Sequence, residues 1–466
     1  MANTTIKGKH YETTLIDDSD SVIKLGKKAL VFYGGEIDVA DPSTLAGLGY
    51  GIVEDLATSP DIGGNTYKIG GRVVGLTGAV TTFGDNTRIA IGKTADLSAG
   101  LGIGLGSVLG GDLAGLSIGT VFAGGDNSKI TIAKGADIGG LIGVTTFGAN
   151  SSISNSGNIH TGLLGMLAGD LSALLGGVVV GAAALDAEPL PSAKLVNNGS
   201  IESAVGIIGV LTDGMLIENG PKGNITAGVI GIGSFTMDGM EATINNSGTI
   251  RVTLSLTIPA ELGLPLSVAS VAIFGFDGVE HVNNTGKIFG GVILGGGNDV
   301  FNNVGGAVHG LIMGGLGDDT LIVGKATDVL VELDGEGTDT IQSAFTYVLT
   351  DFVDNLVLTG KKAINATGNA LDNRLQGNGN NNVLTGEDGA DTFVFGTGDR
   401  KDTIADFDVG EGDMIEVAGW GFEDFGALSA KAEDVDGDVV ITLGKDVLTI
   451  KDHVLADLSA SFAFIA

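Results

Sequence analysis

The chain has 466 residues, of which 81 are Gly, only 7 are Pro and none is Cys, and 43% of its residues are hydrophobic. This composition excludes collagen-like and proline-rich sequence, argues against disorder, and leaves no disulfides or thiolate zinc sites. A net charge of −32 excludes the basic surface that nucleic-acid binding requires, so we expect no nucleic-acid partner. The charge is uneven, because the residues from Asp299 onward include 30 acidic and 9 basic side chains.

The first 70 residues are expected to form an N-terminal cap region. The opening sequence MANTTIK has no apolar core, so we expect no N-terminal secretory signal. The longest uncharged apolar stretches, residues 97–111 and 171–185, are interrupted by Gly and are too short to span a membrane. No transmembrane segment is therefore expected.

Residues 71–293 repeat one pattern, in which a β-like stretch is followed by a Gly/Asn/Asp corner and another stretch ending in Ile or Val. Examples are VTTFGDNTRIAIG from Val80, VFAGGDNSKITIAKG from Val121 and ATINNSGTI from Ala242. Asn and Gly tolerate the left-handed backbone of tight corners, and the β-branched residues between them favour strands. The pattern predicts an all-β fold, a parallel β-helix (β-solenoid).

Three insertions rich in Leu, Ala, Val and Gly interrupt this repeat at residues 97–117, 161–180 and 252–267. They either fold back on the coil or form an apolar ridge that neighbouring copies bury. The second alternative predicts self-association.

A calcium-binding pattern occupies residues 294–345. Residues 314–322 (GGLGDDTLI) match the nonapeptide Gly-Gly-x-Gly-x-Asp-x-apolar-x in full, and residues 294–302 and 334–342 each lack only the first Gly. Calcium prefers six to eight oxygen ligands, which Asp carboxylates and the carbonyls of glycine turns can supply. Several Ca²⁺ ions are expected, held in these turns and in two later ones by Gly295, Gly297, Asp299, Gly315, Gly317, Asp319, Gly335, Gly337, Asp339, Asn381, Gly389 and Asp391.

Residues 368–417, which include the strand-like segment DTIADF from Asp402, resemble the C-terminal region of RTX (repeats-in-toxin) exoproteins of the serralysin type. The resemblance implies that residues 346–466 form an RTX β-roll. It also implies export from a Gram-negative bacterium by type I secretion machinery, through an uncleaved signal similar to the apolar ending SFAFIA. More loosely, the N-terminal repeats resemble the β-helical passengers of autotransporters and haemagglutinins.

The sequence offers little support for catalysis. The zinc-protease pattern His-Glu-x-x-His is absent, and the one Gly-x-Ser-x-Gly match, around Ser117, lacks the strand–elbow–helix context of a hydrolase. The alternative is a β-helical polysaccharide lyase or C5-epimerase, and the Thr pairs at residues 81–82 and 145–146 suggest an ice-binding face more remotely.

We therefore expect a non-enzymatic, secreted calcium-binding structural protein of the cell surface or extracellular matrix, such as a surface-layer, filament or biofilm component. The expected partners are further copies of the chain and the secretion machinery. A cell-surface polysaccharide is a further candidate.

Overall fold

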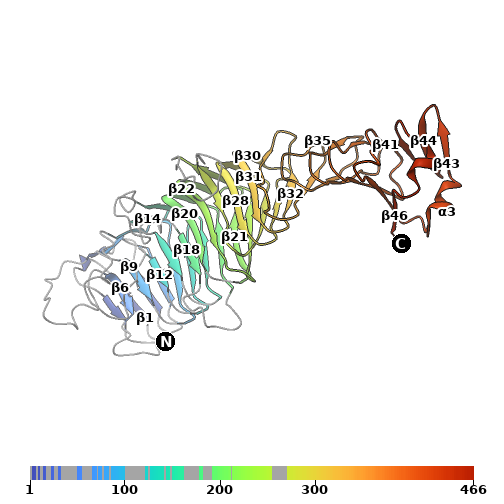
Figure 1. Ribbon diagram of the computed structural model, residues 1–466. Helices are drawn as coiled ribbons and strands as arrows, with labels where there is room; N and C mark the ends of the chain where they lie inside the picture. The colour runs from blue at the N-terminus through green and yellow to red at the C-terminus, as the bar shows by residue number, and fades with distance from the viewer. Residues whose placement is uncertain are drawn as a thin grey trace. The chain divides into compact units, whose positions relative to one another are not determined.

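The computed structural model describes individual strands within residues 1–65 and most of residues 66–99, 121–161, 178–181, 192–253 and 270–465. These residues are almost entirely β, with one short helix, α3 (Phe425–Ser429), and one 3-10 turn, η4 (Leu455–Leu458). They form long parallel sheets, which confirms the prediction of an all-β parallel β-helix (Figure 1). The chain divides into an N-terminal unit, Met1–Val292 with Val308–Gly310, and a C-terminal unit, Ile293–Ala307 with Leu311–Ala466.

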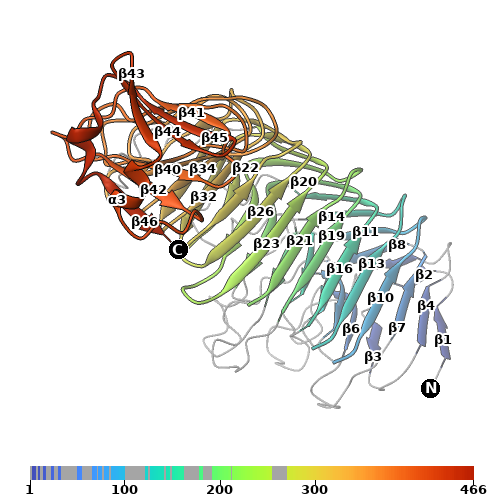
Figure 2. The ribbon, with the colours of Figure 1, turned by 90° about the vertical axis from the view of Figure 1, so that its right-hand side faces the viewer.

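In the N-terminal unit, each rung of the coil adds one strand to a first parallel sheet (Figure 2). Its earliest strands lie within the first 70 residues, so the region expected to cap the coil contributes rungs to it. The strands are β1 (Asn3–Ile6), β4 (Val22–Leu25), β7 (Thr66–Ile69), β10 (Arg88–Ile91), β13 (Lys129–Ile132), β16 (Ser152–Asn155), β19 (Lys194–Asn197), β21 (Met215–Asn219), β23 (Glu241–Asn246) and β26 (Val279–Asn284).

The second sheet receives the next part of each rung in two parallel tracks, which the long strands β20 (Ser200–Val210) and β22 (Asn224–Phe235) join. The first track contains β2 (Lys9–His10), β5 (Leu30–Phe32), β8 (Arg72–Gly75), β11 (Asp96–Ala99), β14 (Asp137–Gly140), β17 (Asn158–Thr161), β24 (Thr249–Val252) and β27 (Lys287–Phe289). The second contains β3 (Thr14–Ile16), β6 (Tyr50–Glu54), β9 (Gly78–Thr82), β12 (Val121–Ala123), β15 (Val144–Thr146), β18 (Val178–Gly181) and β25 (Val271–Phe274). The strands β31 (Leu311–Leu316) and β33 (Val329–Leu330) belong to the C-terminal unit, and β28 (Gly291–Gly296) and β30 (Ala307–His309) contain residues of both units.

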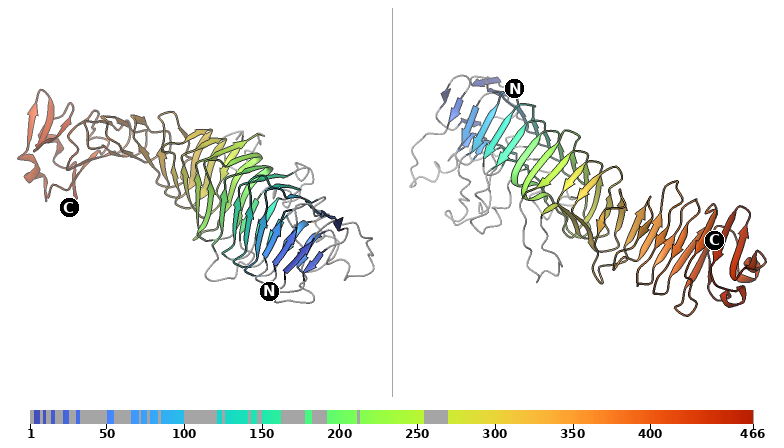
Figure 3. Two further views of the ribbon diagram at one scale, coloured as in Figure 1. Left: turned by 180° about the vertical axis from the view of Figure 1, so that it is seen from behind. Right: turned by 90° about the horizontal axis from the view of Figure 1, so that it is seen from above.

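The core of the N-terminal unit consists of aliphatic columns, because alternate residues of a strand face inward and successive rungs are in register. In the first sheet one column places Ile89, Ile130, Ile153, Leu195, Ile217, Ile244 and Val282 directly above one another. All are at most 1% exposed. Figure 3 shows the stacked rungs from two further sides.

A second inward column of the first sheet is polar. The side-chain Nδ2 atoms of Asn155, Asn197, Asn219 and Asn246 each donate to the Oδ1 atom of the next asparagine, at 2.8–2.9 Å, and the series ends at Asn284. All five side chains are at most 1% exposed. Stacking satisfies buried amides that would otherwise destabilise the core, and we call this column the asparagine ladder.

Asparagines also turn the corners that lead into the first sheet. Asn86, Asn127 and Asn150 have φ of 55°, 52° and 52°. These values lie in the left-handed region that the sequence pattern predicts at these corners.

Most of the three apolar insertions lies outside the described residues, so self-association through them stays a prediction. In the part of the chain that the structure describes, no helix has the length and apolarity to cross a membrane.

The C-terminal unit contains a parallel run of first-sheet strands and, further along the chain, a third sheet. The first-sheet strands are β29 (Val300–Asn302), β32 (Thr320–Val323), β34 (Thr340–Ser343), β36 (Asn355–Leu358), β38 (Arg374–Gln376), β40 (Thr392–Gly396), β42 (Met414–Ala418) and β46 (Phe462–Ile465). The third sheet contains β35 (Tyr347–Val348), β37 (Ala366–Thr367), β39 (Val383–Thr385), β41 (Lys401–Ile404) and β45 (Asp446–Ile450). It ends in the antiparallel strands β44 (Asp438–Leu443) and β43 (Ala432–Val435).

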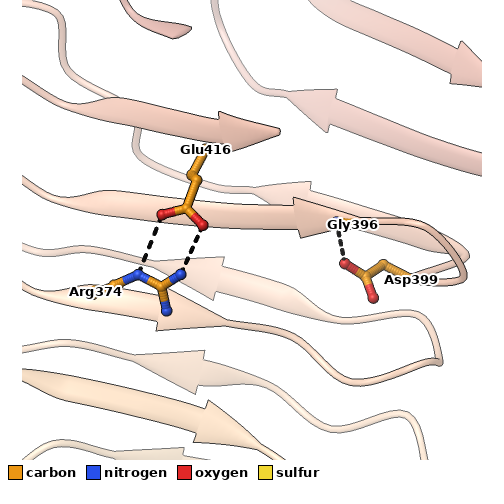
Figure 4. Close-up of polar contacts among 4 residues, drawn as sticks. All are labelled: Arg374, Gly396, Asp399 and Glu416. Carbon is orange, nitrogen blue, oxygen red and sulfur yellow. Dashed lines mark hydrogen bonds and ion pairs between the residues drawn. The ribbon is translucent and has the colours of Figure 1, made fainter. Parts of the chain in front are cut away.

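An ion pair ties three strands of this unit together on the outer face. Arg374 on β38 donates to both carboxylate oxygens of Glu416 on β42, at 2.8 and 3.4 Å. Because β40 pairs with both strands, the pair spans it (Figure 4).

Candidate functional site

Every glycine that the sequence assigns to calcium binding has a positive φ. The values are 104° at Gly295, 113° at Gly297, 105° at Gly315, 126° at Gly317, 80° at Gly335, 155° at Gly337 and 120° at Gly389. Stacking adds a second reason for glycine at these positions. A Cβ atom on Gly317 would lie 2.0 Å from the carbonyl oxygen of Gly297, and one on Gly337 would lie 2.0 Å from that of Gly317. The turns therefore lie in direct backbone contact, one rung above another, and other residues are excluded there.

A column of acidic and amide side chains runs through these turns. Each member immediately precedes a first-sheet strand, from β29 to β42. The members, which we call the carboxylate column, are Asp299, Asp319, Asp339, Asp354, Asn373, Asp391 and Asp413.

Backbone hydrogen bonds hold the carboxylates in this register. The backbone nitrogen of Asp299 donates to Asp319 Oδ1 at 2.7 Å, and that of Asp319 donates to Asp339 Oδ1 at 2.9 Å. The backbone nitrogen of Asp339 likewise donates to Asp354 Oδ2 at 2.8 Å, so the three predicted turns lie together with a fourth carboxylate. Further along, Asn373 donates to Asp391 and Asp391 to Asp413, at 2.8 and 2.9 Å.

These carboxylates are buried close to one another. Asp299, Asp319 and Asp339 are each 1% exposed, and Asp391 is fully buried. Burial raises the pKa of Asp319 to about 7, and the nearby charge of Asp339 contributes to the rise. Burial also raises the pKa of Asp391 to about 7 and that of Asp339 to about 6. Within the described residues, Oδ2 of Asp319 and of Asp391 accepts no hydrogen bond.

Glu332 adds a further buried carboxylate beside the turns. It is 2% exposed and accepts hydrogen bonds from the backbone nitrogens of Gly314 and Gly315, at 2.9 and 3.3 Å. Burial raises its pKa to about 8, and the charges of Asp339 and Asp319 act in the same direction. Its position among glycine-turn nitrogens places negative charge where the turns stack.

A second, shorter column accompanies the third sheet, with Asn382 just before β39 and Asp402 within β41. The backbone nitrogen of Asn382 donates to Asp402 Oδ1 at 2.9 Å. Asn382 is 2% exposed, whereas its neighbour Asn381 is exposed. The structure thus puts Asn382, one residue beyond the expected Asn381, in the place that Asp occupies in the other turns.

Asp402 lies near two more carboxylates. Burial raises its pKa to about 8, with contributions from Asp399 and Asp446, and within the described residues its Oδ2 has no hydrogen-bond partner. Asp446 accepts from the backbone nitrogens of Gly398 and Arg400, and Asp399 accepts from that of Gly396 at 2.5 Å (Figure 4).

The sequence analysis missed Glu332, Asp354, Asn373, Asn382, Asp402 and Asp413 because few of them follow a complete glycine turn. A simpler signal would have found five of these six residues. In each of these five an Asp or Asn is followed by any residue and then an apolar one, at or next to the start of a strand, as in Asp354-Asn355-Leu356 and Asp413-Met414-Ile415. Glu332 has no comparable signal.

The residues fit a hard divalent cation in charge, burial and donor type. Buried oxygens without a hydrogen-bond partner, such as Asp319 Oδ2, are suited to a cation. Among the described residues, no group of three or more His, Cys, Asp or Glu side chains could hold a metal ion by itself. A calcium shell would therefore combine carboxylates with carbonyl oxygens of the glycine turns.

Comparison of the sequence with protein-family models and with curated proteins finds no match.

Proposed function

We propose that the C-terminal unit binds several calcium ions along the carboxylate column and folds fully only when they are bound. The observation that carries the proposal is the stack of glycine turns with positive φ around buried carboxylates. Like charges stacked on successive rungs repel one another, and a divalent cation reverses the sign of that interaction.

The chain's own residues prepare the column for a cation. Backbone nitrogens hold one oxygen of Asp319 and of Asp339, which fixes the rotamer of each carboxylate. Glycines keep the turns close enough for carbonyl oxygens and carboxylates to share one ion. Bound calcium would supply positive charge and oxygen coordination between neighbouring turns.

We further propose that the protein is a secreted structural component of a cell surface or matrix, exported through type I machinery as the RTX resemblance implies. Calcium-dependent folding suits that route, because the acidic turns would stay open at low cytosolic calcium and close outside the cell. The apolar ending, resembling an export signal, pairs as β46 with β42 in the folded unit. Export would therefore precede closure of this strand.

A calcium titration tests the proposed binding. The only tryptophan, Trp420, lies in the C-terminal unit, so its fluorescence reports on that unit alone. We expect calcium to change Trp420 fluorescence and to increase the far-ultraviolet β signal. Magnesium at the same concentration should do much less, since it demands smaller octahedral shells. If calcium changes neither signal and calorimetry detects no binding, the proposal is wrong.

A further inference from the structure

A recess of about 850 Å³ lies on the N-terminal unit, remote in sequence from the carboxylate column. It opens at the corners that connect first-sheet strands to second-sheet strands. Its lining includes Lys134, Ser156, Asn158, Asn198 and Lys222.

The lengths of successive corners create this recess. Between β13 and β14 the corner has four residues, 133–136, and between β21 and β22 it again has four, 220–223. The two intervening corners, Ser156-Gly157 and Asn198-Gly199, have only two residues each. Two corners of two residues thus lie between two corners of four residues, along the neighbouring strands β13, β16, β19 and β21 (Figure 2).

The two short corners form the floor of the recess, and their glycines allow them to pack closely against neighbouring backbone. A Cβ atom on Gly157 would lie 2.7 Å from the carbonyl oxygen of Ala136, and one on Gly199 would lie 2.1 Å from that of Gly157. Larger residues at either position would push the corners outward and fill the recess.

The charge of the lining is opposite to that of the whole chain. The chain carries 56 acidic and 24 basic residues, yet the lining contains Lys134 and Lys222 and no Asp or Glu. Both lysines are exposed, and neither forms an ion pair within the described residues. Ser156, Asn158 and Asn198 also line the recess, and no side-chain hydrogen bond of theirs is found within that part of the chain, so their hydroxyl and amide groups are available to a ligand.

The width of the recess suits a single extended chain. Three strand spacings separate the two four-residue corners, which puts their backbones about 14 Å apart. We propose that the recess binds an acidic oligosaccharide, with its carboxylates reaching Lys134 on one wall and Lys222 on the other. Sugar hydroxyls then pair with Asn158, Asn198 and Ser156 on the floor.

Calorimetric titration of the full chain with a hexauronate, at fixed calcium and low ionic strength, tests this site. A neutral hexaglucoside serves as the uncharged probe. We expect binding of the hexauronate alone, weakened about threefold by Lys134→Gln or Lys222→Gln and about tenfold by both together. Asn158→Asp, which adds a negative charge to the floor without changing its shape, should weaken binding by a similar factor.

Lys129→Gln is the matched control, because Lys129 is exposed on the same rung as Lys134 but outside the recess. It should leave the affinity unchanged. The proposal is overturned if the hexauronate does not bind, if the neutral sugar binds equally well, or if the double variant retains wild-type affinity. The last outcome would indicate calcium bridging at the carboxylate column, so failure of this proposal remains separable from failure of calcium binding.

Discussion

Glu280 is an acidic residue buried in the N-terminal unit. Its side chain is fully buried, and its Oε1 atom accepts hydrogen bonds from the hydroxyls of Ser234, at 2.8 Å, and Thr236. Burial raises the pKa of Glu280 to about 7, although both hydroxyls oppose the rise. The folded unit therefore holds a proton on this group at mildly acidic pH.

This shift predicts a pH-dependent stability. Between the usual pKa of 4.5 and about 7 the folded state binds more protons than the unfolded state, so stability should fall as pH rises through that window. The total loss is at most about 3 kcal/mol. Glu280→Gln keeps an acceptor for both hydroxyls and should remove most of this dependence. Urea unfolding from pH 4.5 to 8 measures it, with exposed Glu241→Gln as control; identical slopes in wild type and Glu280→Gln would contradict the assignment.

Asp319 should influence calcium binding more than Asp391, because it lies between Asp299 and Asp339 in three consecutive glycine turns. Asp319→Asn removes a charge but preserves the acceptor for the Asp299 backbone nitrogen. We expect weaker calcium binding together with higher stability of the calcium-free C-terminal unit, since one buried carboxylate no longer repels its neighbours.

The measurement is calorimetric calcium titration combined with calcium-free denaturation followed by Trp420 fluorescence. Asp391→Asn should show the same two effects to a smaller degree. Exposed Asp351→Asn is the control. Unchanged calcium affinity in Asp319→Asn would argue against ligation by the column.

At the scale of elements, the asparagine ladder replaces an aliphatic column with a hydrogen-bonded one. Strand β23 shows the difference within two residues. Asn246 faces inward, accepting from Asn219 and donating to Asn284, both at 2.8 Å. Asn245 faces outward and accepts a hydrogen bond from Asn283 at 3.1 Å on the exposed surface.

The two positions make a matched pair of variants. Asn246→Leu leaves the Asn219 amide without its acceptor and the Asn284 oxygen without its donor, so we expect a loss of about 2–4 kcal/mol. Asn245→Leu should change stability by about 0.5 kcal/mol or less. Denaturation followed by circular dichroism compares them, and equal effects would show that the ladder does not stabilise the unit.

The same elements show what sequence alone can predict. Left-handed asparagine corners and glycine turns are legible because few residues adopt those φ values, as at Asn127 and Gly317. The asparagine ladder cannot be predicted in this way. Each buried Asn finds its hydrogen-bond partner in the equivalent Asn of another rung, and no local pattern reveals that partner. Asp354 and Asp413 do carry a local Asp-x-apolar pattern, but only the stacked rungs show which carboxylates they join.

At the scale of the whole molecule, two compact units with different cores imply two unfolding transitions. Calcium should raise the melting temperature of the transition that Trp420 reports and leave the other unchanged. Scanning calorimetry with added calcium and with a chelator, beside Trp420 fluorescence, measures both. A single transition that moves as a whole would show instead that the units unfold together.

The ladder also affects how the protein ages chemically. Asparagine deamidates when the backbone nitrogen of the following residue attacks its side-chain carbonyl, and a following glycine hinders that attack least. Asn198-Gly199 is such a pair, but the Gly199 nitrogen donates to Asn197 Oδ1 at 3.2 Å. Three ladder residues restrain a backbone nitrogen at their own corner in this way, Asn197 at Gly199, Asn155 at Gly157 and Asn284 at Gly286. The Asn198-Gly199 bond is thereby protected at the step by which such pairs usually decay.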